Sequence, residues 1–222
     1  MKNHRTLVGG GLTTLGVMIG IAVAASWRVE HVALGTASNE FTLECDFDKF
    51  RQIMVRKDAT GAVVDHAGMR VIQQKVLDID VDARADDRPL LNAIRGRSRS
   101  TLSAEKMLVV QFNDPEIEAG ELELRQLADI RPTRIHVQTQ SRRPAGQVDR
   151  YVTELTAIPA GANTQVNLST QMQIRLQIPF LFKSHADRRV QQSCERGLAQ
   201  QAAALEIFIQ RHADERVIVP EL

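Results

Sequence analysis

The first strong pattern along the chain is an uncharged run from Thr6 to Ser26. At 1.5 Å rise per residue, about 20 apolar or small residues span a bilayer core of roughly 30 Å. Lys2 and Arg5 precede the run, and Trp27 follows it. The positive-inside rule keeps such an N-terminus in the cytoplasm. The pattern predicts a signal anchor over residues 1–27, a single-pass location in the cell membrane, and an extracytoplasmic domain.

A cleaved signal peptide is the alternative for the same run. Ala22, Val23 and Ala24 fit the A-x-A cleavage pattern, which would give a secreted or periplasmic protein. The run is longer than the 7–15 apolar residues that are usual in a signal peptide, which favours retention. The bilayer is the expected partner. Gly16 and Gly20 are spaced for close packing of two helices, which makes a homodimer the alternative to the general frequency of glycine in membrane helices.

Beyond the anchor, the period of the apolar positions changes several times. Residues 28–39 have no clear period and are interpreted as a stalk. Glu40–Cys45 alternates as a strand does, and Asp46 is a candidate N-cap for a helix with Phe47, Phe50 and Met54 on one face. A second short helix is expected between residues 58 and 68. Strands are expected at residues 76–82 and 107–112.

From Glu121 onward the pattern is that of an antiparallel meander ending in a long helix. Alternating segments are separated by turn residues every 10–17 positions until Pro179. Ser184 and Asp187 then form a capping-box pattern. Val190, Cys194, Leu198, Leu205 and Phe208 lie on one helical face until His212. The predicted domain therefore covers residues 40–212, and residues 213–222 form a tail.

Charge and cysteine content restrict the classes of function. When Lys2 and Arg5 are set aside, 26 basic residues remain against 27 acidic ones, so the domain lacks the basic excess of a nucleic-acid binder. Two cysteines, Cys45 and Cys194, are too few for a disulfide framework. Two interpretations stay open for them: a disulfide closing a long loop, or two buried free thiols.

No cluster of residues carries a recognisable catalytic or metal-binding motif. Asp78, Asp80 and Asp82 share one face of a strand, but Ala83 and Pro89 stand where a calcium loop needs Gly and Glu. The histidines lack zinc-site spacing, and no nucleophile elbow or phosphate loop occurs. A solvent-exposed face is the favoured interpretation of these aspartates, with weak cation binding as the alternative. A structural cap is the favoured interpretation of His66 beside Asp65, with an acid–base pair as the alternative. Surface charge balance is the favoured interpretation of Arg95, Arg97 and Arg99, and binding of anionic lipid headgroups or phosphates is the alternative. No catalytic residue, cofactor or metal is predicted.

The order of elements resembles that of the helix-grip fold. The match is carried by LADIRPTRIHVQTQ and YVTELTAIPAGANTQVNLSTQMQI, followed by FKSHADRRVQQSCERGLAQQAAALEIFIQ. The chain is similar here to the START-like (SRPBCC) superfamily of polyketide cyclases, lipid-transfer domains and Bet v 1-type proteins. The resemblance implies an α+β helix-grip domain, with a curved antiparallel sheet, two short helices and a long C-terminal helix, after the N-terminal transmembrane helix.

The same resemblance implies a cavity between the sheet and the long helix. Its expected lining is aliphatic and consists of Leu122, Leu124, Ile135, Val137, Val152, Leu155, Val166, Leu168, Leu198 and Leu205. A lipid or other hydrophobic small molecule fits such a cavity. A solid core is the alternative, because alternating strands look the same in both cases.

Three functions follow as hypotheses. The first is a membrane-tethered domain that binds a hydrophobic ligand without catalysis. The second is an enzyme of the cyclase or dehydratase type, which needs ionisable groups such as His136 or Glu154 inside the cavity. The third is an interaction module with a solid core that assembles in the membrane through Gly16 and Gly20.

Overall fold

The computed structural model describes residues 27–57, 59–66, 69–84, 87, 92, 99–112 and 120–215. Residues 1–26 of the predicted anchor, which include the dimerisation glycines Gly16 and Gly20, lie outside the described residues, as does most of the predicted tail. Within the part that is described, no helix is both long enough and apolar enough to cross a membrane.

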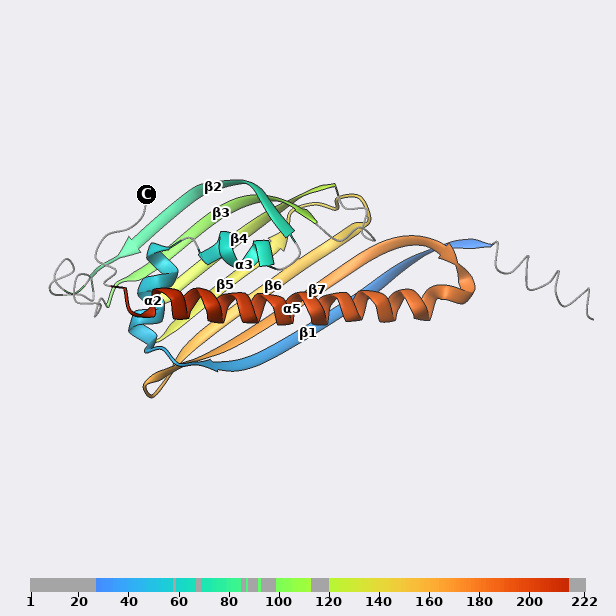
Figure 1. Ribbon diagram of the computed structural model, residues 1–222. Coiled ribbons are helices and arrows are strands. Elements are labelled where there is room, and N and C mark those ends of the chain that lie inside the picture. Colours follow the sequence, from blue (N-terminus) through green and yellow to red (C-terminus); the bar gives the residue numbers. More distant parts are fainter. Residues whose placement is uncertain are drawn as a thin grey trace, which may run out of the picture.

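One curved antiparallel sheet wraps around a long helix (Figure 1). The strand order is β1-β7-β6-β5-β4-β3-β2, so β1 and β2 are the two edges. The strands are β1 (Arg28–Leu43), β2 (Met69–Asp82), β3 (Thr101–Phe112), β4 (Glu121–Arg131), β5 (Arg134–Ser141), β6 (Val148–Ala160) and β7 (Asn163–Pro179). The helices are α2 (Phe47–Arg56), α3 (Ala59–His66), the short 3-10 turn η1 (Phe180–Phe182) and α5 (Lys183–Ala213).

The two short helices and the meander are confirmed where the sequence predicted them. Asp46 caps α2, because its side chain accepts hydrogen bonds from the backbone N–H groups of Asp48 and Lys49. Phe47, Phe50 and Ile53 then point inward and pack beneath the C-terminal half of α5. The predicted apolar face of α5 is buried over its whole length, from Val190 to Phe208.

Four predictions about the ends of elements were wrong. The strands expected at residues 76–82 and 107–112 begin earlier, at Met69 and Thr101. Residues 28–39 are not a stalk: they are the first twelve residues of β1, and Arg28 already pairs with Pro179 of β7. The helix α5 begins at Lys183, and no side chain caps it. Asp187, which was expected to close a capping box, instead accepts a 2.7 Å hydrogen bond from the ring of His31 in β1.

Gly35 sets how closely α5 approaches the sheet. This residue of β1 is buried, and a Cβ atom placed on it would lie 2.6 Å from the carbonyl oxygen of Val190 and 2.7 Å from Sγ of Cys194. Real Cβ atoms do not come so close to a backbone carbonyl, so only glycine fits here without movement of the helix. The absence of a side chain therefore fixes the height of α5 above β1.

Candidate functional site

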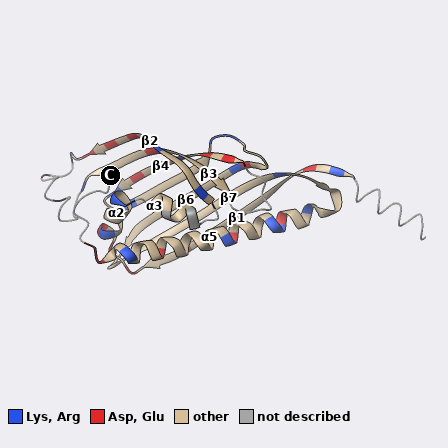
Figure 2. Ribbon diagram, turned by 45° about the horizontal axis from the view of Figure 1, so that its top comes forward, with Lys and Arg blue, Asp and Glu red and all other residues tan. Residues whose placement is uncertain are grey.

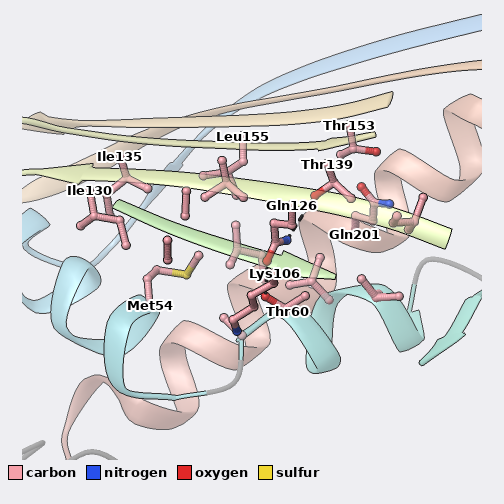
Figure 3. A pocket seen from close by; sticks show the side chains of 18 of the residues that line it. Met54, Thr60, Lys106, Gln126, Ile130, Ile135, Thr139, Thr153, Leu155 and Gln201 are labelled. Atoms are coloured by element: carbon pink, nitrogen blue, oxygen red, sulfur yellow. Dashed lines mark hydrogen bonds between the residues drawn. The ribbon is translucent and has the colours of Figure 1, made fainter. Parts of the chain in front are cut away.

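The concave face of the sheet encloses a cavity of about 210 Å³ beneath α3 and the C-terminal half of α5. Strands β2 to β7 supply its floor, α3 and the end of α2 one wall, and Gln201 and Leu205 of α5 the other. At the Met54 end the lining is aliphatic, with Ile130, Ile135 and Leu155 nearby (Figure 3). Polar side chains gather toward the opposite end.

The first polar group centres on Gln126, which is 9% exposed. Its side-chain N–H donates to the hydroxyl of Thr139 at 3.1 Å, and its carbonyl oxygen accepts from the hydroxyl of Thr60 at 3.0 Å. These bonds tie α3 to β4 and β5 across the cavity (Figure 3). The amide is held at both ends, as a buried polar group requires.

The second polar group joins α5 to β6. The side-chain N–H of Gln201 donates to the hydroxyl of Tyr151 at 3.2 Å, and both residues are buried. Burial raises the pKa of Tyr151, so the phenol stays protonated at neutral pH. The carbonyl oxygen of Gln201 has no hydrogen-bond partner among the described residues, although Gln201 is only 5% exposed. The cavity wall thus carries one buried hydrogen-bond acceptor, the side-chain oxygen of Gln201, without a donor among the described residues.

Comparisons with known proteins give a match in structure alone. No protein-family model matches the sequence, and no curated protein does. An aromatase/cyclase from Streptomyces sp. R1128 is similar with 11% identity and a TM-score of 0.51, over 82% of this chain and 97% of that chain. This chain has the helix-grip fold. The resemblance to the START-like superfamily is thus confirmed for the fold.

Two further solved structures are similar to the helix-grip domain at lower scores. A START superfamily protein from Mycobacterium smegmatis is 13% identical, with a TM-score of 0.47, over 79% of this chain and 97% of that chain. Norcoclaurine synthase from Thalictrum flavum is 12% identical, with a TM-score of 0.41, over 97% of this chain and 98% of that chain.

The helix-grip cavity contains six of the ten aliphatic residues that the sequence predicted for it. These six are Leu124, Ile135, Val137, Leu155, Leu168 and Leu205. Leu122, Val166 and Leu198 are buried in the core clusters instead of lining the cavity. Val152 was placed on the wrong face of β6: its neighbours Tyr151 and Thr153 line the cavity, so its own side chain points to the outer face.

The prediction missed the polar side chains of the cavity. Thr60, Gln126, Thr139 and Gln201 line it, together with Lys106, which is the one formally charged residue among the described lining residues. Gln126 lies at the same strand parity as Leu124 and Ala128. A polar residue inside an inward-facing apolar series was therefore the available signal, and it was not used.

His136 and Glu154 do not reach the cavity, so the enzyme hypothesis loses the two residues it named. Both lie on the outer face of the sheet. The His136 ring is 3.3 Å from the hydroxyl of Thr156, and Glu154 accepts a 2.8 Å hydrogen bond from Gln138. These cross-strand contacts satisfy side chains that water also reaches.

The acidic face of β2 is an exposed surface, as the sequence predicted. Asp78, Asp80 and Asp82 are solvent-exposed and appear as red bands toward one end of the strand (Figure 2). Among the described residues no group of three His, Cys, Asp or Glu side chains is placed to hold a metal ion. Arg99 is described, whereas Arg95, Arg97 and the side chains of Asp65 and His66 lie outside the described residues.

Cys45 and Cys194 do not form the disulfide that was one of two interpretations. Both are free and buried, and they belong to different core clusters. Burial raises the pKa of the Cys194 thiol to about 11 and also raises that of Cys45. The folded state holds the proton of the Cys194 thiol more tightly than the unfolded state does, because its pKa there is above the usual 9.0. This stabilisation of the folded state is complete below pH 9.0 and is lost as the pH rises through about 11.

We therefore expect both thiols of the folded protein to be unreactive toward a chromogenic aromatic disulfide at about pH 8, since the thiolate is the reacting species. Unfolding in denaturant without a reductant should release two reactive thiols, which absorbance measures directly. Rapid reaction of the folded protein would contradict the buried placement of the thiols. Absence of reaction after unfolding would show that the two cysteines form a disulfide.

Proposed function

We propose that residues 1–27 tether this protein to a membrane, and that its helix-grip domain binds a lipid or another hydrophobic small molecule outside the cytoplasm, without catalysis. The cavity of about 210 Å³ is the observation that carries the proposal. It lies below the roughly 300–1,000 Å³ of a typical ligand pocket, so it suits a compact apolar molecule or one chain of a larger lipid.

The lining supports an apolar ligand. Aliphatic side chains such as Ile130, Ile135 and Leu155 surround one end of the cavity. Burying apolar ligand surface there contributes about 25 cal/mol per Å². Val76 and Ile79 of the edge strand β2 line the cavity and are also 48% and 58% exposed. They offer an apolar ligand an entry path between β2 and α3.

The polar end supports a ligand that also carries a hydroxyl group. Gln201 presents an unpartnered buried carbonyl oxygen, and an unsatisfied buried acceptor costs about 1–3 kcal/mol. A hydroxyl donating to this oxygen would remove that cost when the ligand binds. Tyr151 fixes the amide from its other side through the 3.2 Å hydrogen bond. The expected ligand is therefore amphipathic: an apolar body with one alcohol end.

The location part of the proposal is supported by the sequence of the N-terminal run. Thr6–Ser26 is uncharged and of bilayer-spanning length, with Lys2 and Arg5 before it and Trp27 and Arg28 after it. An apolar ligand is concentrated in membranes, so a tethered domain is close to its supply.

The proposal predicts a selective effect of the variant Gln201→Leu. Affinity for naphthol should fall about tenfold, as expected for one lost hydrogen bond of about 1.4 kcal/mol, while affinity for naphthalene should not fall. Fluorescence titration of both probes measures the two affinities. Gln192→Leu, on the exposed side of the same helix, is the matched control and should leave both unchanged.

The titration distinguishes two results that would contradict parts of the proposed function. Equal losses for naphthol and naphthalene in Gln201→Leu would contradict the hydroxyl contact while leaving an apolar site. Absence of binding of either probe to the unmodified protein would contradict ligand binding in this cavity.

A further inference from the structure

The start of β1 and the passage from β7 into α5 lie at the same end of the molecule (Figure 1). Large apolar side chains are exposed there. Trp27 is 71% exposed, and Phe180, Leu181 and Phe182 are 58%, 55% and 52% exposed. We call these four residues the aromatic end surface. None of the residues of η1 is buried. Exposure of three consecutive apolar side chains to water does not stabilise a protein, and apolar patches of this kind mark sites of contact with a partner or a membrane.

Backbone pairing holds the two parts of this surface together. The N–H of Phe180 donates to the carbonyl oxygen of Trp27 at 3.3 Å, and Arg28 lies opposite Pro179 in the β1–β7 ladder. The aromatic end surface is therefore built from two segments more than 150 residues apart in sequence, which are kept adjacent by the sheet. Its side chains project from one fixed edge of the fold.

Basic side chains surround the same edge. Arg28 follows Trp27, and Lys183 follows Phe182, with its ammonium group 5.1 Å from the centre of the Phe180 ring. Arg188 and Arg189 lie in the second turn of α5 and are exposed. The acidic side chain of Asp187 is paired with His31 at 2.7 Å. Glu30, two residues after Arg28, is also exposed, and its carboxylate lies 3.8 Å from the guanidinium of Arg175. Apolar side chains with these cations beside them match a bilayer surface that contains anionic lipid.

We propose that the aromatic end surface lies in the interface of the lipid bilayer and fixes the orientation of the domain on the membrane. The inference rests on the tethering part of the proposed function. The occupant is lipid because the uncharged run of the sequence ends at Ser26, directly before Trp27, so the chain brings this surface to the bilayer. Trp beside cationic residues is the composition that membrane interfaces favour.

The orientation has a consequence for the cavity. Lys183 starts α5 at the aromatic end surface, and Gln201 lies eighteen residues further along the helix, or about 27 Å at 1.5 Å per residue. Docking of this surface therefore places the whole cavity beyond the bilayer surface. Its polar end at Gln201 is nearer to the membrane than its aliphatic end, because Leu205 lies further along α5. A ligand must leave the membrane completely in order to reach Gln201.

A single tryptophan makes the proposal testable, because Trp27 is the only one in the chain. In the full-length Trp27→Phe background, Leu181→Trp places a probe on the aromatic end surface. Ile207→Trp is the matched control, since Ile207 is 54% exposed and lies toward the other end of α5. Both variants are reconstituted into vesicles of phosphatidylcholine and phosphatidylglycerol, with and without bromine on the acyl chains, and flotation confirms that each protein is in the vesicles.

We expect tryptophan emission of Leu181→Trp to shift to shorter wavelength and to fall at least about twofold in brominated vesicles, whereas Ile207→Trp should change little. Floating protein whose Leu181→Trp emission is no more quenched than that of the control would overturn the docking surface but leave the tether intact. Protein that does not float would overturn the tether and, with it, the docking surface. Neither outcome depends on ligand binding in the cavity.

Discussion

The substitution Gly35→Ala is expected to lower the free energy of unfolding by about 1–3 kcal/mol, although it adds only one methyl group. The new Cβ would lie 2.6 Å from the carbonyl oxygen of Val190 and 2.7 Å from Sγ of Cys194. The first of these atoms belongs to the backbone of α5, so a change of side-chain rotamer cannot relieve the contact. The helix must move away from β1, and packing along both elements is lost.

Urea unfolding of the purified protein, followed by circular dichroism, measures the effect. Gly120→Ala is the matched control, because no atom of the described residues lies within 4 Å of the position that a Cβ would take there, and its backbone does not need glycine. We expect the control to be as stable as the unmodified protein or slightly more stable. Equal stability of Gly35→Ala and the control would show that α5 is not held at this height by Gly35.

The substitution Val137→Trp is expected to abolish ligand binding while the domain remains folded. Val137 points into the cavity from β5, and the larger indole would occupy much of the roughly 210 Å³ that a ligand needs. Naphthol affinity should therefore fall by more than about tenfold, because ligand and indole compete for one volume. Overpacking should cost about 1–3 kcal/mol of unfolding free energy, which urea unfolding measures separately.

The control for this effect uses the same change on the other face of the sheet. Val152 is half-buried on the outer face of β6, so Val152→Trp adds the same indole outside the cavity. Naphthol affinity should be retained in Val152→Trp. Equal losses in the two variants would mean that the probe does not bind where the cavity lies.

The sequence predicted the meander and the long helix well because their periodicities come from burial. Val190, Cys194 and Leu198 recur at helical spacing on the side of α5 that packs on the sheet. The start of β1 escaped prediction for a physical reason. Its buried positions are Ala33 and Gly35, which are small because α5 lies so close, and small residues give a weak hydropathy signal.

Cavity residues were harder to predict than elements, for three reasons. Strand parity decides which side chains point inward, and Val152 and Leu155 differ in parity, so they could not both do so. The β-bulge between Val148 and Arg150 adds a local shift that hydropathy does not reveal. Gln201 lies on a helix rich in exposed glutamines, and only the fold distinguishes it as buried against Tyr151.

Native mass spectrometry of the full-length protein, released from membranes in mild detergent, tests ligand binding most directly. We expect an added mass on the unmodified chain that organic extraction removes, that Val152→Trp keeps and that Val137→Trp loses. The extracted compound should be apolar with a hydroxyl group, to match the lining and the free acceptor of Gln201. Bare chain mass in all three proteins, together with no binding of naphthol, would contradict the claim that this cavity holds a hydrophobic ligand.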